Sequence, residues 1–229
     1  MNLSARLKKI IEILDLPTTV ADIGTDHAYI PIYLAQNSEC SAIIASDAKK
    51  QPYQVAVEHV QRAEVSKRVE IRLGSGLSVL KEEEVETVII AGMGGPTIKE
   101  IIATDYKLAQ QLEQIVLQPM AGAASLRKWL VDNRFKITDE KLVRGQKAEK
   151  IYQVLRVEPG IMDIDDDFLL ELGPKLIENR EELLVEYLDE LKENWKNIMD
   201  KIAINAPQHE KINELEHKID RLEEVKEWL

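Results

Sequence analysis

The residues of this 229-residue chain that are best suited to chemistry stand together in the segment Asp22-Ile23-Gly24-Thr25-Asp26-His27-Ala28. The segment begins within a short apolar run that is typical of a buried strand. A glycine where a strand turns into a helix lets the backbone approach a ligand closely and directs the helix N-terminus at it. Asp22, Gly24, Asp26 and His27 are therefore candidate ligand-binding residues, and Asp26 and His27 are also the candidate catalytic residues.

A second acidic residue, Asp47, ends the next apolar run, 23 residues after Gly24. An acid at this position binds both hydroxyls of a ribose, so a nucleoside ligand is indicated, with Ala48 beside it. NAD-dependent enzymes place an acid here too. Their pyrophosphate, however, needs a trio of glycines, and the trio is missing, with Asp26 in the second place and Ala28 in the third. The cationic sulfonium of S-adenosylmethionine tolerates an acidic loop, and the spacing resembles the D-x-G-x-G-x-G loop of methyltransferases.

Two further glycine-containing loops follow predicted strands, at the strand ends where open α/β sheets bind ligands. Gly74, Ser75 and Gly76 follow the third strand and are expected to lie under an adenine. In the loop after the fourth strand, Ala91, Gly92 and Met93 are expected to contact the cofactor, and Met93, Gly94 and Gly95 the substrate. Gln118 and Pro119 end the fifth strand on the same side and complete the expected substrate contacts. The glycines of the fourth loop indicate either room for a flat ligand or a tight structural turn.

The elements that position these loops follow from the alternation of short apolar runs with longer helical patterns. Strands are expected over residues 19–23, 42–46, 69–73, 85–91 and 114–118, with helices near 28–37, 51–65, 96–103, 105–111 and 122–132. Residues 135–143 and 150–157 predict two more strands with no helix between them. The fold class is therefore α/β, a mostly parallel Rossmann-like sheet of the class I methyltransferase type with a closing antiparallel hairpin.

The last third of the chain has a different pattern. Apolar residues recur at spacings of three and four from Leu184 to Ile202 and again from Ile212 to Val225, which is typical of a coiled-coil seam. Pro207 interrupts the pattern, so two antiparallel helices are expected. We therefore divide the chain into a methyltransferase domain of residues 1–160 and a helical coiled-coil extension of residues 161–229.

Charge is distributed unevenly between these two parts. The net charge of −11 belongs wholly to residues 161–229, while residues 1–160 are neutral. Residues 127–156 carry nine Lys/Arg against four acidic residues, a surplus that suits phosphate contacts or, alternatively, an ordinary solvated surface. The expected phosphate contacts are Arg127, Lys128, Arg134, Lys136, Arg144 and Lys147, with minor contacts from Lys192 and Lys196.

Composition narrows the class of protein further. No apolar run approaches the length of a membrane helix, and the N-terminus does not resemble a secretory signal. The single cysteine, Cys40, and the four histidines show no zinc-ligand spacing, so no metal is expected. A cytoplasmic location without membrane attachment is the expectation.

The segment 22–31, the loop 91–95, the residues 117–119 and the run Leu126-Arg127-Lys128-Trp129-Leu130 together resemble the bacterial tRNA (adenine-22-N1)-methyltransferase family. The resemblance covers essentially the whole chain, because that family joins a class I methyltransferase domain to a C-terminal coiled coil. It implies methyl transfer from S-adenosylmethionine to N1 of an adenine in tRNA. Ser75 departs from the expected Asn or Asp, but serine can still form a hydrogen bond.

Adenine N1 already carries a lone pair, so alignment with the methyl group matters more than a strong base. Asp26 is then the candidate acceptor for the adenine amino group, and His27 either orients the base or caps the helix. The alternatives are a class I methyltransferase of a small molecule or protein, and a non-catalytic S-adenosylmethionine-binding regulator. The sequence leaves the oligomeric state open between monomer and weak dimer.

Overall fold

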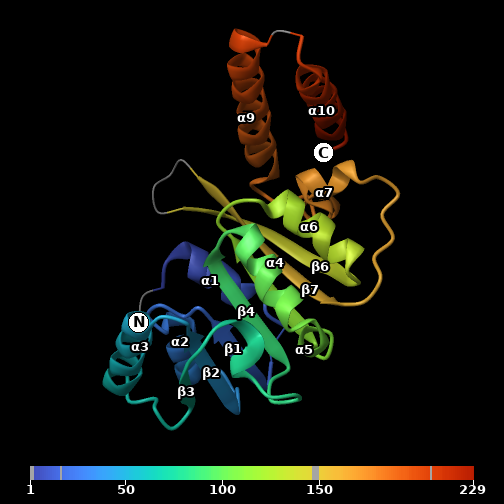
Figure 1. Cartoon of the computed structure of the whole chain (residues 1–229). Coiled ribbons are helices and arrows are strands. Elements are labelled where there is room, and N and C mark those ends of the chain that lie inside the picture. Colours follow the sequence, from blue (N-terminus) through green and yellow to red (C-terminus); the bar gives the residue numbers. More distant parts are fainter. Residues whose placement is uncertain (1–2, 16, 146–149, 207) are drawn as a thin grey trace. The chain divides into compact units, whose positions relative to one another are not determined.

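The computed structural model describes residues 3–15, 17–145, 150–206 and 208–229. The chain forms two compact units, Met1–Lys175 and Leu176–Leu229 (Figure 1). The boundary expected at residue 160 lies just after the last strand, and the residues that follow belong to the first unit up to Lys175. A short helix, α7 (Phe168–Leu172), accounts for the difference, since its Leu170 is part of the hydrophobic core of the first unit.

Seven strands of the first unit form one sheet in the order β3-β2-β1-β4-β5-β7-β6 (Figure 1). The strands are β1 (Thr19–Ile23), β2 (Ala42–Asp47), β3 (Val69–Leu73), β4 (Thr87–Met93), β5 (Gln114–Pro119), β6 (Phe135–Arg144) and β7 (Ile151–Pro159). β1 to β5 pair in parallel, whereas β7 runs antiparallel to both β5 and β6. The predicted mostly parallel sheet with a closing antiparallel hairpin is therefore confirmed.

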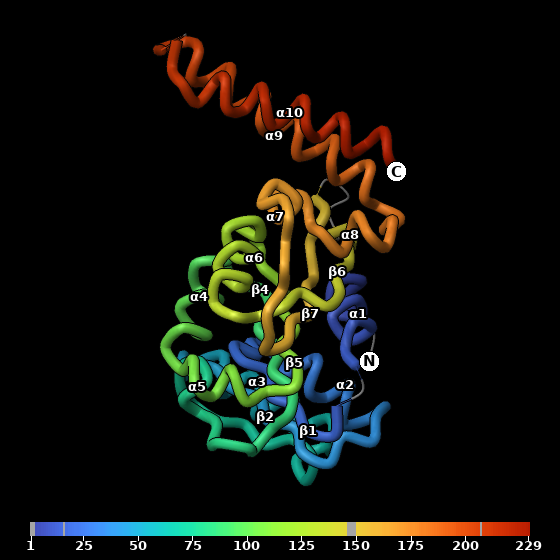
Figure 2. The backbone as a smooth tube through the Cα atoms, turned by 90° about the vertical axis from the view of Figure 1, so that its right-hand side faces the viewer, coloured from blue at the N-terminus to red at the C-terminus, as the bar shows by residue number. Residues whose placement is uncertain are grey.

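Helices cover both faces of this sheet. They are α1 (Ala5–Glu12), α2 (Tyr29–Asn37), α3 (Lys50–Arg62), α4 (Gly95–Thr104), α5 (Tyr106–Ala109) and α6 (Ala123–Asp132), with the 3-10 turn η1 (Gly76–Val79). One core cluster contains residues of α1, α2 and α3, and the other contains residues of η1 and α4 to α7. Figure 2 shows α1 and α2 on one side of the sheet and α4 and α6 on the other.

The strand sequences explain this two-sided packing. Successive side chains of a strand point to opposite faces, so Val88 and Ile90 of β4 enter one core while Ile89 enters the other. All three are completely buried. Strands buried on both faces need continuous apolar runs, which is the pattern that marked them in the sequence.

One helix of the first unit was missed by the sequence analysis. α1 begins after Ser4, whose hydroxyl accepts a hydrogen bond from the Leu7 backbone N–H at 3.4 Å, and it buries Ile10 completely. Leu7, Ile10, Ile11 and Leu14 recur at helical spacing, which is the signal that could have identified it. The helix contacts β6 and β7 and so lies beside the closing hairpin.

The second unit begins within α8 (Pro174–Glu178) and continues as α9 (Leu184–Asn205) and α10 (Glu210–Glu227), which pack together as an antiparallel pair. The predicted seam residues Leu188, Leu215 and Leu222 are buried, whereas Ile198 is 42 % exposed. Ion pairs also join the two helices, with Lys192 Nζ 2.8 Å from Glu223 and Lys226 Nζ 2.6 Å from Asp189. No helix within the described residues is long and apolar enough to cross a membrane.

Candidate cofactor cleft and nucleotide cavity

The carboxyl ends of β1, β2, β3 and β4 surround a cleft of about 730 Å³, here called the strand-end cleft. Its lining includes Gly24, Asp26, Asp47, Ala48, Gly74, Ser75, Gly76, Ala91, Gly92 and Met93. The volume lies within the usual range for cofactor and small-ligand sites. The structure thus brings together every predicted cofactor residue except Asp22 and His27, which line a neighbouring cavity.

The loop after β1 is held close to β2 by its backbone. The amides of Gly24 and Thr25 both donate to the carbonyl oxygen of Ser46, each at 2.8 Å. Gly24 has φ +80°, and a Cβ at this position would lie 2.1 Å from Cε of Met93. Glycine adopts this left-handed conformation without strain and leaves room for the flexible end of Met93, so the loop can pass directly beside the cleft.

Asp47 presents a carboxylate at the end of β2. Its Oδ1 accepts the backbone N–H of Lys49 at 2.7 Å, while Oδ2 has no hydrogen-bond partner among the described residues. The Asp47 carbonyl oxygen accepts the Gly74 amide at 3.0 Å, which draws the third loop alongside. A fixed carboxylate with one open oxygen suits a pair of ribose hydroxyls.

The third loop is supported by an arginine that the sequence analysis did not identify. Both Nη atoms of Arg72 donate to Glu84 at 2.7 Å, and Nη1 also donates to the carbonyl oxygen of Val79 at 2.7 Å. These bonds hold the pKa of Glu84 down at about 2 and the pKa of Arg72 above its usual range. Arg72 therefore fixes the two ends of the segment that carries Gly74, Ser75 and Gly76.

Two glycines near the end of β4, Gly92 and Gly95, have different structural roles. Gly92 has φ +78° and interrupts the pairing of β4 with β5, so it is a bulge that turns the strand end into the cleft. Gly95 is instead buried, and a Cβ there would lie 2.6 Å from the carbonyl oxygen of Gly122. The expectation that Gly95 contacts substrate is therefore wrong, because that glycine serves close packing of α4 against the loop after β5.

A second cavity of about 920 Å³, here called the hairpin cavity, lies between α1, the loop after β1 and the β6–β7 hairpin. Its lining includes Arg6, Asp22, Gly24, Thr25, Asp26, His27, Tyr29, Ala91, Gly92, Arg144, Lys150 and Tyr152. Gly24, Asp26, Ala91 and Gly92 also line the strand-end cleft, so the two hollows meet along these residues.

The floor of the hairpin cavity carries a buried carboxyl group. Asp22 is 7 % exposed, and its Oδ2 accepts the Thr25 hydroxyl at 2.6 Å. Burial raises the pKa of Asp22 to about 6, although the Thr25 hydrogen bond and the nearby Arg6 charge act in the opposite direction. A carboxyl group with a raised pKa beside two ligand-sized hollows is characteristic of a functional site.

Asp26 and His27 lie side by side where the two hollows meet. His27 Nε2 is 3.3 Å from Asp26 Oδ2, and the Asp26 side chain is 71 % exposed. An exposed carboxylate of this kind can accept a hydrogen bond from a ligand without a large desolvation cost. The contact between the two side chains was not predicted from the sequence, and the catalytic role of both residues stays a prediction.

Gln118 and Pro119 do not reach a ligand. Both are buried in β5, and Gln118 accepts a hydrogen bond from Arg6 Nη1 at 2.6 Å while its Nε2 donates to the Pro119 carbonyl oxygen. The expectation of direct substrate contacts is wrong for these side chains. Gln118 instead holds Arg6 of α1, a residue that the sequence analysis missed together with its helix.

Arg127 is also misassigned as a phosphate contact. It is completely buried, its Nε donates to Glu140 Oε1 at 2.6 Å and its Nη1 donates to the Leu170 carbonyl oxygen at 3.2 Å. Gln153 Oε1 accepts a further bond from Nη2. A guanidinium with these partners joins α6 to β6, β7 and α7, and it has no surface to offer a phosphate.

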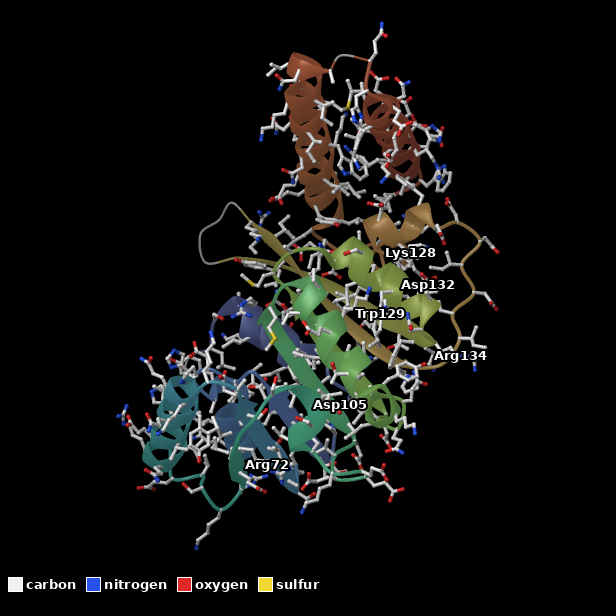
Figure 3. The ribbon with its side chains drawn as sticks, in the orientation of Figure 1. Arg72, Asp105, Lys128, Trp129, Asp132 and Arg134 are labelled. Carbon is white, nitrogen blue, oxygen red and sulfur yellow. The ribbon has the colours of Figure 1, made fainter. Side chains whose placement is uncertain are left out.

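The remaining expected phosphate contacts do not form one patch. Arg134 precedes β6 and Arg144 ends it, so the length of a strand, roughly 30 Å, separates them. Lys128 Nζ pairs with Asp167 at 2.7 Å and Lys136 with Glu158 at 2.7 Å, and Figure 3 shows Lys128 on α6 with Arg134 beyond its end. Lys147 lies outside the described residues. Of the expected set, Arg144 lines the hairpin cavity, where Lys150 joins it.

In the second unit, the two expected minor contacts are also paired. Lys192 bonds with Glu223, and Lys196 Nζ lies 3.0 Å from Glu193. Each of these pairs has an exposed partner and contributes little to stability, so both lysines can exchange partners at small cost.

Comparison with known proteins agrees with this geometry. A family model described as tRNA (adenine(22)-N(1))-methyltransferase matches residues 20–224. The chain is similar to the Bacillus subtilis (strain 168) tRNA (adenine(22)-N(1))-methyltransferase, with 29 % identity over 99 % of the chain and 97 % of the relative.

Solved structures extend this similarity to the whole backbone. The crystal structure of the B. subtilis m1A22 tRNA methyltransferase TrmK gives a TM-score of 0.86 at 29 % identity, with 98 % of each chain covered. The M. capricolum TrmK structure in complex with S-adenosyl-homocysteine gives 0.83 at 27 % identity, again with 98 % of each chain covered.

Proposed function

The chain belongs to the tRNA (adenine(22)-N(1))-methyltransferase family, and we propose that it transfers a methyl group from S-adenosylmethionine to N1 of adenine 22 in tRNA. The observation that carries the proposal is the meeting of two hollows along Gly24, Asp26, Ala91 and Gly92. A two-substrate transfer needs two sites that meet where the group is exchanged.

The residues of the strand-end cleft fit S-adenosylmethionine. The open oxygen of Asp47 suits the ribose hydroxyls, and the loop Gly74–Gly76 suits the adenine. Asp26 adds negative charge at the cleft, which favours the cationic sulfonium and would oppose a pyrophosphate. When bound, S-adenosylmethionine supplies the electrophilic methyl group.

The protein's part in the reaction is to align the acceptor and to stabilise its product. Adenine N1 is nucleophilic without deprotonation, so alignment supplies most of the required acceleration. Asp26 lines both hollows, where it can accept a hydrogen bond from the adenine amino group and offset the positive charge of the methylated ring. His27, 3.3 Å from Asp26, orients this carboxylate.

Access of tRNA follows from the same geometry. An adenine must leave its stack to reach a cavity of this kind. Arg144 and Lys150 line the hairpin cavity and are placed to hold the phosphates of the extruded nucleotide. The candidates for contacts with other parts of tRNA are Lys128, Arg134, Lys136 and the helical second unit, Leu176–Leu229. We also propose a cytoplasmic location, where tRNA is found.

The proposal is tested with purified protein, labelled S-adenosylmethionine and an unmodified tRNA transcript. Incorporation should depend on adenine 22, so a transcript with guanine at that position is the matched control. Asp26→Asn should bind tRNA and the cofactor yet transfer methyl groups at least about tenfold more slowly, because a charge that stabilises the cationic product is lost. Equal incorporation into both transcripts would refute the position, and cofactor binding without any turnover would favour a regulator.

A further inference from the structure

Three rings form a cluster beside the hairpin cavity, and two of them, His27 and Tyr29, line it. The His27 ring lies 5.1 Å from the Tyr29 ring and 5.4 Å from the His59 ring, and Tyr29 and His59 are 5.8 Å apart. The interplanar angles are between 19° and 27°, so the three rings are nearly parallel. His27 and Tyr29 come from the start of α2, whereas His59 comes from α3 on the other side of β2 in the sequence.

Few hydrogen bonds fix these rings. His59 Nδ1 lies 3.1 Å from the His27 carbonyl oxygen. His27 Nδ1 is buried and has no hydrogen-bond partner among the described residues. The neighbours of the His27 ring are therefore the two other rings and Asp26, so the ring cluster is in contact with the proposed catalytic carboxylate.

Tyr29 and His27 both reach solvent, and the His27 side chain is 42 % exposed. Tyr29 is 39 % exposed, and its hydroxyl has no hydrogen-bond partner within the described parts of the chain. A tyrosine that only packed α2 against α3 would bury its ring. Tyr29 instead lines the hairpin cavity, with its ring backed by two imidazoles.

The same cavity is also lined by two cationic side chains, Arg144 and Lys150. Lys150 Nζ lies 5.2 Å from the centre of the Tyr152 ring and donates to the Met120 carbonyl oxygen at 2.9 Å, and Arg144 lies beside it in the lining. A cavity lined by both aromatic rings and positive charge matches a nucleotide, whose base stacks and whose phosphate is anionic.

We infer that Tyr29, supported by His27 and His59, is the stacking surface for the extruded target adenine; this inference rests on the proposed function. A base stacked on Tyr29 lies in the cavity that meets the strand-end cleft at Asp26 and Gly92. Its reactive edge can therefore face the methyl donor while Arg144 and Lys150 hold its phosphate. Tyr29 is thus a substrate-binding residue that sets the preference for a planar base.

The test compares Tyr29→Phe, Tyr29→Leu and the control Tyr33→Leu, a tyrosine of the same helix that lines neither hollow. Tyr29→Phe should retain tRNA affinity within about threefold, because the stacking face is kept. Tyr29→Leu should lose roughly 5- to 150-fold, the range for removal of one base–aromatic stack, with unchanged affinity for S-adenosylmethionine. Tyr33→Leu should behave as the unmodified protein does.

A tRNA with an abasic site at position 22 shows which base is stacked. Tyr29→Leu should bind this tRNA as tightly as the unmodified protein does, because the two changes remove the same interaction. A loss that persists with the abasic tRNA would overturn the assignment to the target adenine, and equal tRNA affinity of the Leu and Phe variants would overturn stacking altogether. If Tyr29→Leu unfolds, Tyr29→Met replaces it. Failure of the unmodified protein to methylate tRNA would count against the proposed function instead.

Discussion

Replacement of Asp22 by asparagine should stabilise the protein at neutral pH. The Asp22 carboxyl group is 7 % exposed, and burial raises its pKa from 3.8 to about 6. The folded state therefore binds this proton more tightly than the unfolded state, and stability is lost as the pH rises from about 4 to about 6. The difference in pKa corresponds to about 3 kcal/mol of unfolding free energy once the group is ionised. Asparagine avoids this cost, and its amide oxygen can still accept the Thr25 hydroxyl.

The measurement is urea unfolding of Asp22→Asn and the unmodified protein at several values between pH 4 and pH 8. The difference in unfolding free energy should be small at pH 4, grow through pH 6 and then stay at about 3 kcal/mol, or about 6–12 °C in melting temperature for a chain of this size. The control Asp200→Asn, an exposed position on α9, should show no such pH dependence. A variant that is no more stable than the unmodified protein at pH 8 would refute the reasoning.

Three further predictions concern the strand-end cleft and the buried arginine. Asp47→Ala should weaken S-adenosylmethionine binding by about 2–3 kcal/mol in calorimetry, because a charged acceptor for the ribose is lost, and unchanged affinity would refute that assignment. Gly24→Ala should weaken the same binding by at least about fivefold, since a Cβ at φ +80° displaces Met93, and adding Met93→Ala should restore part of the affinity; full affinity of the single variant would contradict this. Arg127→Met should cost about 3–5 kcal/mol of unfolding free energy by leaving the buried Glu140 carboxylate without its guanidinium partner, with normal tRNA affinity of the folded protein; reduced tRNA affinity at unchanged stability would restore Arg127 as a phosphate contact.

The sequence by itself determined the sheet and the loops that line the strand-end cleft. The apolar runs of β1, β2 and β5 identified these strands because strands covered on both faces must be largely apolar. The alternation of strands and helices predicts parallel strands, whose carboxyl ends lie at one edge of the sheet. The loops after Ile23, Asp47 and Leu73 are therefore expected to lie close together.

Tertiary structure decided which polar side chains face a ligand. A count of charges along residues 127–156 cannot distinguish the buried Arg127 from the exposed Arg144, because both are arginines and only their packing in the folded protein differs. The length of β6 also separates Arg134 from Arg144, although a net charge treats them as neighbours.

Contacts between distant segments were equally invisible in the sequence. His59 joins the rings of His27 and Tyr29 only because α2 and α3 pack on the same face of the sheet. Arg6 reaches Gln118, 112 residues away, because α1 lies beside the closing hairpin. Local patterns fix the strands, since each strand buries its own apolar residues. The hairpin cavity, by contrast, forms only where segments far apart in the sequence pack together, so the sequence of any one segment does not predict it.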